Sequence, residues 1–255
     1  MRNMPRRARE KSSTGIYHIL IKGINRRSIF EDDKDYAKMI EIIQKCKEQS
    51  EFKFYGYCLM ANHVHLLMRE GTEAISLTMQ KINSAYANWY NRKYDRFGHL
   101  FQDRYKSEPV EDVSYMLTVL RYIHQNPIKA GITKTVEDYK WTSYHEYSSK
   151  QTLIDRGFIL ALFASERHQA IEKIKNYMNE NNEDICLDYQ ETKRFTDEEV
   201  REIISEKYGV IPGKFLLLDK EEQNIILKNI KAIKGTTIRQ VARVTGTSKY
   251  MVEKA

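Results

Sequence analysis

The apolar residues in the first half of the chain recur in two ways, one typical of strands and one typical of helices. Short, partly alternating apolar segments predict strands over 15–23, 52–60, 63–70 and near 98–110. Apolar positions three and four residues apart predict helices over 32–50, 72–94 and 112–125. We expect a tight turn at Ala61 and Asn62, and we expect Asn126 and Pro127 to stop the third helix. The order β-α-β-β-α-β-α predicts an α+β fold of the ferredoxin-like, split βαβ type, with an antiparallel sheet and helices on one side.

The pattern changes after about residue 150. The segment 164–184 (ASERHQAIEKIKNYMNENNED) is polar and amphipathic with helical spacing, ends in a cluster of Asn and acidic residues, and is interpreted as a connector. Three helical stretches follow from Phe195 onward. The sequence therefore predicts a domain over 1–150, a helical connector over 151–194 and an all-α region over 195–255.

Composition is that of a globular protein in water. Of the 255 residues, 41% are apolar and 30% are charged, and no apolar run approaches the roughly 20 residues that span a bilayer. The basic N-terminus lacks the apolar segment of a secretory signal, which favours a cytoplasmic, non-membrane protein. The three cysteines are scattered, which argues against a disulfide framework and against a thiolate zinc site.

The positive charge is concentrated in two blocks. Residues 1–30 hold eight Lys or Arg against one acidic residue, and residues 220–255 hold eight against three. Such blocks indicate a phosphate polyanion as partner, which would place the protein at the nucleoid, although a basic N-terminal tail is also typical of a solvated, disordered arm.

Two histidines stand on one predicted strand with a single valine between them. Successive side chains of a strand point to opposite faces, so His63 and His65 share a face while Val64 and its alternate neighbours fill the core. The pair fits a metal site, and it also fits two half-buried histidines satisfied by hydrogen bonds. His18 lies on another predicted strand without an identifiable partner and is interpreted as a structural histidine.

A tyrosine and an amide lie one turn apart on the predicted helix 112–125 and its end. Tyr122 is off the apolar stripe of that helix, and Asn126 lies almost above it. This placement suits a nucleophile beside a metal ligand. The chain has 17 tyrosines, however, and most tyrosines only pack or cover a surface.

Several motifs in order resemble one family. The run ANHVHLLM, the segment 97–112 (FGHLFQDRYKSEPVED) and the segment 120–132 (LRYIHQNPIKAGI) are similar to the REP-associated tyrosine transposases of the HUH, single-tyrosine endonuclease class. The resemblance covers about residues 14–147. Ala61 stands where the family usually has proline, and Lys22-Gly23 stands where Arg-Gly is usual.

The resemblance implies a chemistry for these positions. It makes His63 and His65 metal ligands, Asn126 a third polar ligand and Tyr122 the nucleophile. The family reaction is a transesterification of single-stranded DNA that leaves a 5′-phosphotyrosine and a free 3′-hydroxyl. Imidazoles alone would suit several transition metals, and it is the resemblance that favours Mg²⁺ or Mn²⁺.

Basic residues near these motifs are candidate contacts to a single DNA strand, because they are interleaved with aromatic rings. Arg104 and Lys106 are two apart on a predicted strand and therefore share a face. Ordinary surface charge beside core aromatics is the competing interpretation. The candidates in this region are Arg92, Lys93, Arg96, Arg104 and Lys106, and the basic N-terminal block adds Arg26 and Arg27.

The last helical stretch has the spacing of a helix-turn-helix. A small residue, Ala242, a turn glycine, Gly246, and an apolar anchor, Val252, resemble the C-terminal duplex-binding domain of replication initiators. Ser248, Lys249 and Tyr250 would open the recognition helix. A plain helical hairpin remains the alternative.

These features predict a metal-dependent single-strand DNA endonuclease and strand-transferase of the transposase type. Its partner would be single-stranded DNA with hairpin or palindromic repeats, with duplex DNA bound by the C-terminal region, and the protein would act as a monomer or homodimer. The alternatives are a DNA-binding regulator that does not cut, and a replication or conjugation nickase. The sequence shows no phosphate-binding G-x-x-x-x-G-K-[ST] loop, in keeping with a reaction that needs no nucleotide cofactor.

Overall fold

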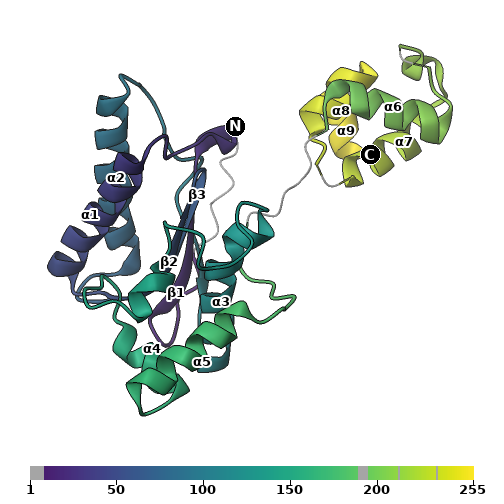
Figure 1. Ribbon diagram of the computed structural model, residues 1–255. Helices are drawn as coiled ribbons and strands as arrows, with labels where there is room; N and C mark the ends of the chain where they lie inside the picture. The colour runs from purple at the N-terminus through teal and green to yellow at the C-terminus, as the bar shows by residue number, and fades with distance from the viewer. Residues whose placement is uncertain (1–8, 189–194, 212, 234) are drawn as a thin grey trace. The chain divides into compact units, whose positions relative to one another are not determined.

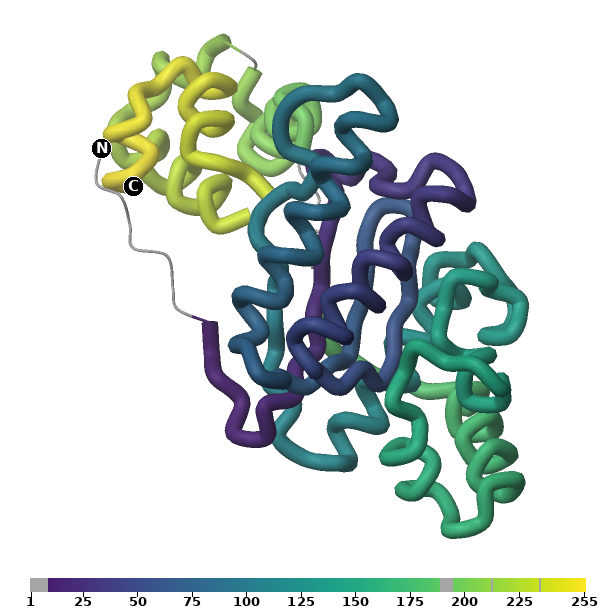
Figure 2. Tube along the Cα trace, turned by 90° about the vertical axis from the view of Figure 1, so that its left-hand side faces the viewer, coloured from purple at the N-terminus to yellow at the C-terminus, as the bar shows by residue number. Residues whose placement is uncertain are grey.

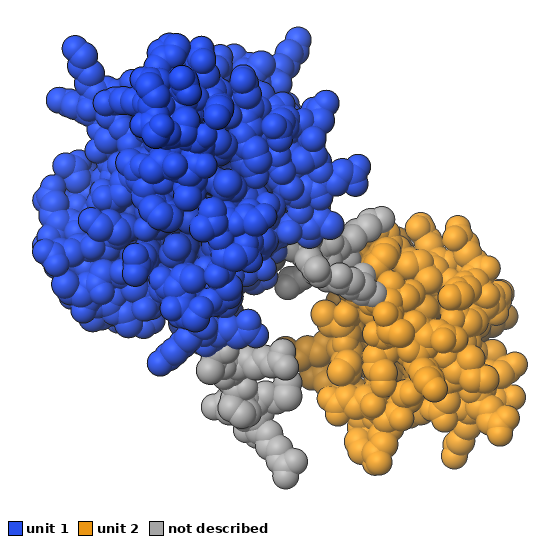
Figure 3. Space-filling model, turned by 90° about the horizontal axis from the view of Figure 1, so that it is seen from below, with its two compact units in different colours: residues 1–188 blue, residues 189–255 orange. Residues whose placement is uncertain are grey.

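The computed structural model describes residues 9–188, 195–211, 213–233 and 235–255, which form two compact units (Figure 3). The first unit extends to Asp188 and the second begins at Tyr189. The predicted boundary at residue 150 therefore differs from the division that the structure shows. Each unit has its own hydrophobic core and is described by itself.

The first unit is built on a four-stranded antiparallel sheet (Figure 1). Its strands are β1 (Ile16–Lys22), β2 (Lys53–Met60), β3 (His63–Arg69) and β4 (Lys106–Pro109), in the spatial order β2-β3-β1-β4. β2 and β3 form the predicted hairpin through Ala61 and Asn62. The predicted α+β class is confirmed, although the fourth strand is much shorter than the expected segment 98–110.

Helices cover both faces of this sheet. Helices α1 (Asp33–Ser50) and α2 (Ile75–Lys93) lie on one face, where Figure 2 shows them in front of the strands, and α3 (Val113–Lys129) lies on the other (Figure 1). The prediction of helices on one side is therefore wrong for α3. The physical reason is that the middle of β3 is buried on both of its faces, and each buried face needs a covering layer.

α3 continues through Pro127 and does not stop before it. The amide of Ala130 donates to the carbonyl oxygen of Asn126 at 2.9 Å, which completes a last turn beyond the proline. The φ angle of proline is compatible with a helix, so the last turn can form, although Pro127 lacks the N–H that would bond the carbonyl of Ile123 and its ring crowds that carbonyl. Gly56 on β2 lets this helix approach the sheet, because a Cβ there would come within 2.7 Å of Leu120.

The predicted connector is part of the first unit. Helices α4 (Arg156–Phe163) and α5 (Arg167–Asn179) bury Ile159, Ala170 and Ile174 in the core that also contains the sheet. Two short 3-10 helices, η1 (Ile24–Arg26) and η2 (Ser143–Tyr147), complete this unit. α4 is almost entirely apolar, and α5 buries a stripe of three residues, Ala170, Ile174 and Met178, among its charged positions.

The second unit is helical, as predicted. It contains α6 (Asp197–Tyr208), η3 (Phe215–Leu217), α7 (Lys220–Ala232), α8 (Ile238–Thr245) and α9 (Lys249–Lys254). Gly246 has a φ of 74° and ends α8, which is the left-handed conformation that a turn glycine supplies. Val252 on α9 is fully buried in the core of this unit.

In the described ranges, no helix is long and apolar enough to cross a membrane. The cysteines Cys46, Cys58 and Cys186 are all free and buried.

The buried histidine of α3 should make the stability of the protein depend on pH. His124 is fully buried, its ring nitrogens bond Leu120 O and Ser143 Oγ, and burial lowers its pKa from 6.5 to about 4. As the pH falls below 6.5, the imidazole is protonated in the unfolded chain before it is protonated in the folded protein. The free energy of unfolding therefore decreases as the pH falls from 6.5 to about 4. Each pH unit between the two values costs about 1.4 kcal/mol, so His124 should account for about 2 kcal/mol of lost stability at pH 5.

Urea unfolding of the metal-free protein at pH 7 and pH 5 checks this, with His124→Gln as the comparison. The variant should lose about 2 kcal/mol less than the wild type between the two pH values. Equal losses would contradict the assignment.

Candidate active site

One face of the sheet gathers the polar residues that the sequence singles out. The register pairs Lys22 with His63 and Leu20 with His65, so these four side chains lie in two adjacent rows on one face. Lys106 pairs with Leu20 from the other side and extends the second row. α3 covers this face, and its Tyr122 ring lies with its centroid 5.8 Å from that of His65.

His63 and His65 are adjacent, as the strand pattern predicts. Their ring centroids are 5.1 Å apart. The Nδ1 atom of His63 lies 2.6 Å from Oδ1 of Asn62, so Nδ1 carries the proton and Nε2 keeps its lone pair. Burial lowers the pKa of both histidines, that of His65 well below its usual value, so both rings are neutral at pH 7.

His18 lies against His65, a contact that the sequence analysis missed. Both side chains are fully buried, and His18 Nε2 is 3.0 Å from His65 Nδ1. On its other side His18 faces its cross-strand partner Glu108, with Nδ1 to Oε2 at 3.8 Å. The predicted split βαβ topology implies that β1 lies beside β3, but the register that sets His18 against His65 cannot be determined from one sequence.

Tyr122 is buried between α3 and the sheet, and not on a polar side of the helix as predicted. Its ring makes edge contacts with His18 and His65, and its side chain is 4% exposed. The hydroxyl donates to Oδ2 of Asp188 at 2.6 Å. Burial first, and then this carboxylate, raise the pKa of the Tyr122 phenol above its usual value.

Asn126 joins the tyrosine to the histidines. Its Nδ2 donates to the backbone carbonyl of Tyr122 at 3.0 Å, which leaves the side-chain oxygen as an acceptor. The amide interacts with the His63 ring, where it partly offsets the effect of burial on the histidine pKa. The structure thus brings His63, His65, Tyr122 and Asn126 together.

The residues of this face suit a divalent ion, although none of the described residues forms a group of three or more His, Cys, Asp or Glu arranged to hold one. The predicted ligands include only two residues of these types, His63 and His65, because the third predicted ligand is the amide of Asn126. The Nε2 atom of His65 is buried and has no hydrogen-bond partner, an arrangement that a metal ion would satisfy.

Residues 180–188 pass over α3 and complete the site. Arg121 on α3 bonds Glu180 and Asp184, and the amide of Leu187 donates to Glu108 at 3.0 Å. Asp188 follows and accepts the Tyr122 hydroxyl. This role could not be predicted from the sequence, because the segment has no apolar period and its partners lie about 60 to 80 residues away.

The predicted DNA-contact residues are only partly brought together. Lys106 is exposed on the histidine face, and Arg104 precedes β4 and lines a shallow groove with Lys106 and Tyr105. Because Arg104 lies outside the strand, the argument that both cations share a strand face does not apply. Arg26 and Arg27 are exposed in the loop after β1, beside Asn62.

The remaining candidates lie elsewhere. Arg96 follows α2, on the opposite face of the sheet, with its guanidinium 5.6 Å from the Tyr90 ring centroid. Ser248 caps α9 in the second unit, and Lys249 and Tyr250 are exposed on the first turn. The basic residues Arg2, Arg6 and Arg7 lie outside the described residues.

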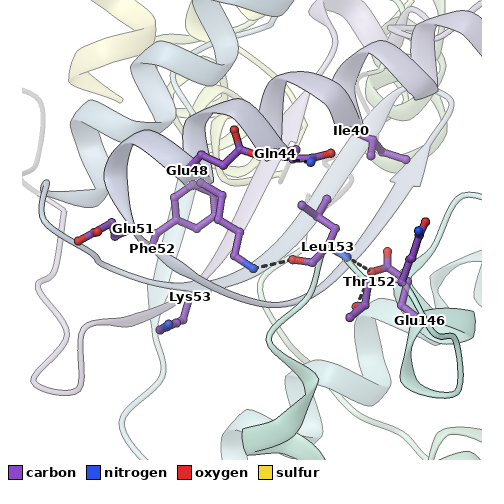
Figure 4. Close-up of a pocket in the computed structure, with 11 residues that line it drawn as sticks. Ile40, Gln44, Glu48, Glu51, Phe52, Lys53, Glu146, Thr152 and Leu153 are labelled. Carbon is purple, nitrogen blue, oxygen red and sulfur yellow. Dashed lines mark hydrogen bonds between the residues drawn. The ribbon is translucent and has the colours of Figure 1, made fainter.

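A polar groove on the first unit is separate from this face. It lies between the end of α1 and residues 146–153, where Lys47 donates to the carbonyl of Leu153 (Figure 4). Its lining mixes acidic and basic side chains and includes neither the histidines nor Tyr122.

The fold and the site together define an α+β protein in which a helix carries a tyrosine and an amide across a pair of strand histidines. Residues 11–126 match the family model described as "Transposase IS200 like". The matched segment contains the whole sheet and every member of the set His63, His65, Tyr122 and Asn126.

Two relatives show how far the similarity extends. A Haemophilus influenzae protein named as a REP-associated tyrosine transposase is 25% identical over 113 residues, which are 40% of this chain and 64% of the relative. A solved structure of a REP-associated tyrosine transposase bound to a REP hairpin is 20% identical, covers 58% of this chain and 87% of that chain, and superposes with a TM-score of 0.50. The second similarity supports the fold of the first unit.

Proposed function

We propose that this protein is a metal-dependent single-strand DNA endonuclease and strand-transferase that uses Tyr122 as its nucleophile. The observation that carries the proposal is the placement of the Tyr122 ring against the His63 and His65 face, with Asn126 one turn beyond. The match of residues 11–126 to the IS200-like transposase family supports a DNA-processing reaction.

In the proposed reaction the phenol oxygen of Tyr122 attacks a DNA phosphorus atom. A bond forms between that oxygen and phosphorus, the bond from phosphorus to the 3′ oxygen breaks, and the 3′ oxygen leaves as a hydroxyl after taking up a proton. Asp188 accepts the hydroxyl hydrogen bond at 2.6 Å and is therefore placed to receive the phenol proton. The reverse reaction rejoins strands without a nucleotide cofactor.

His63, His65 and Asn126 would hold a divalent ion, Mg²⁺ or Mn²⁺, opposite the tyrosine. When bound, such an ion polarises the scissile phosphate and stabilises charge on the departing oxygen. The chain prepares both imidazoles for this, because burial keeps them neutral and each has its Nδ1 engaged by a neighbour.

The substrate we propose is single-stranded DNA with palindromic repeats. Support comes from the exposed cations Lys106 and Arg104 beside the site, and from the hairpin bound by the structural relative. We assign duplex binding to the second unit, where Gly246 turns the chain between α8 and α9, and Ser248, Lys249 and Tyr250 would meet the DNA.

Replacing one cation of the groove should weaken DNA binding without abolishing it. Each of Arg104→Ala and Lys106→Ala removes about one phosphate contact, so the slope of log affinity against log salt concentration should fall by about 0.7 for a single strand. Fluorescence anisotropy with a labelled oligonucleotide over a salt series measures this slope. Lys45→Ala is the control, since Lys45 is an exposed lysine paired with Glu41 on α1, and an equal fall there would refute the assignment.

A covalent-adduct assay tests the proposed function. Purified protein is incubated with 3′-labelled single-stranded DNA spanning the palindromic repeats beside its own coding region, with Mg²⁺, Mn²⁺ or a chelator. A labelled protein band on a denaturing gel that requires metal would establish the phosphotyrosine chemistry. Binding of the same DNA without such a band under any metal would instead indicate a regulator that does not cut.

A further inference from the structure

A chain of three side chains runs across the sheet behind the proposed metal face. Glu108 on β4 and His18 on β1 are direct cross-strand partners, and His18 lies diagonally from His65 on β3. The separations are 3.8 Å from Glu108 Oε2 to His18 Nδ1 and 3.0 Å from His18 Nε2 to His65 Nδ1. His65 ends the chain with an Nε2 atom that has no hydrogen-bond partner.

The carboxylate at the start of this chain is fixed in place. Oε2 of Glu108 accepts the hydroxyl of Tyr115 at 2.7 Å and the amide of Leu187 at 3.0 Å. Two donors from different segments therefore hold that oxygen toward His18. At 3.8 Å the contact with His18 Nδ1 is longer than a hydrogen bond, so it acts through charge.

One of two proton arrangements suits these three groups better. If His18 carried its proton on Nε2, its Nδ1 lone pair would face the Glu108 carboxylate, and His65 would place a buried N–H at Nε2 without an acceptor. With the proton of His18 on Nδ1, that N–H faces the carboxylate, Nε2 accepts from the Nδ1–H of His65, and the lone pair of His65 lies on its Nε2. Each arrangement leaves one buried N–H without a hydrogen bond, that of His65 Nε2 in the first and that of His18 Nδ1 in the second. The second arrangement is favoured because its N–H faces the Glu108 carboxylate at 3.8 Å, whereas the first would set a lone pair against that charge.

We propose that His18 and Glu108 are positioning residues that fix the tautomer and orientation of His65, so that its Nε2 lone pair faces the metal ion. The inference rests on the proposed function and deepens it. Asn62 does the same for His63 through its contact with Nδ1, so both imidazoles would present Nε2 to one ion. Partners of this kind, behind the ligands, commonly change metal affinity by about 10- to 100-fold.

The test compares His18→Leu, His18→Gln and Glu108→Gln in the full chain. Nitrogen-15 NMR of the imidazoles in the metal-free protein reports the tautomer of His65, and titration with Mn²⁺ followed by electron paramagnetic resonance reports affinity. His18→Leu should lose the single Nδ1–H tautomer and weaken Mn²⁺ binding by about 10- to 100-fold. His18→Gln keeps an oxygen acceptor and should recover part of both, and Glu108→Gln should shift both in the same direction as His18→Leu by less.

His124→Leu is the matched control, because His124 is equally buried and bonds only structural groups. It should lower stability and leave the His65 tautomer and Mn²⁺ affinity unchanged. If His18→Leu does not fold, the Gln variants carry the comparison. An unchanged His65 tautomer and Mn²⁺ affinity within twofold in the folded variants would overturn the proposal. Wild-type protein that binds no Mn²⁺ would overturn the proposed function, while the tautomer in the metal-free variants would still decide whether His18 and Glu108 set it.

Discussion

Tyr122→Phe should abolish the covalent protein–DNA adduct, with a loss of at least about 10³-fold in strand cleavage. The variant removes only the phenol oxygen, which is the atom that would bond to phosphorus. In the described part of the chain, Tyr122 is the tyrosine whose ring contacts His18 and His65. The adduct gel measures the effect.

The control is Tyr144→Phe. Tyr144 is also buried, and its hydroxyl also donates to a carboxylate, Glu137, at 2.8 Å, but its ring contacts His124 and His145 and not the candidate site. It should keep full adduct formation. DNA binding should persist in Tyr122→Phe, because the cations of the surface are unchanged. Adduct formation by Tyr122→Phe at the wild-type rate would show that another residue is the nucleophile.

The bond between Tyr122 and Asp188 has two consequences for this reaction. The carboxylate is a proton acceptor in contact with the proposed nucleophile. It also stabilises the protonated phenol, because burial and Asp188 raise the pKa of Tyr122. Arg121 holds the segment that carries Asp188 in place through its bonds to Glu180 and Asp184.

Local periodicity was enough to predict most of the first unit. The strand over 63–70 and the helix over 112–125 both exist, and the alternation of His63 and His65 correctly placed the two rings on one face. These features depend on neighbours within one turn or one strand pair. The helix end was wrong, because the rule that proline stops a helix does not hold where the proline falls in the last turn.

The rest depended on contacts between distant parts of the chain. Periodicity shows that a position is buried but not which element covers it, so the placement of α3 on the second face was missed. His18 and His65 are separated by 47 residues, and Glu108 lies further along the chain. The side chains of His65, His18 and Glu108 come into line only through the register of β3 with β1 and of β1 with β4. Residues 180–188 were interpreted as part of a connector. Their polar side chains bond α3 in the structure, but the sequence alone does not distinguish polar residues that bond the protein from polar residues that face solvent.

The second large effect should come from removing one candidate ligand. His63→Ala should weaken Mn²⁺ binding and reduce metal-dependent adduct formation by about 10² to 10³-fold, since a bound divalent ion contributes several kcal/mol of charge stabilisation in the transition state. His63 is the better choice for this test, because its side chain is half-buried, whereas His65 is fully buried and its loss would also leave a cavity.

The comparison is His168→Ala, which removes an imidazole whose side chain is 79% exposed. That variant should match the wild type in Mn²⁺ affinity and in adduct yield. Titration with Mn²⁺ and the adduct gel are run on the same preparations, so that a loss of affinity and a loss of chemistry can be compared directly. If His63→Ala loses affinity but recovers adduct formation at high Mn²⁺, His63 serves to hold the ion, and Tyr122 with Asp188 supplies the remaining chemistry. If it retains both at low Mn²⁺, the paired histidines are structural, and the metal requirement must be met elsewhere in the protein.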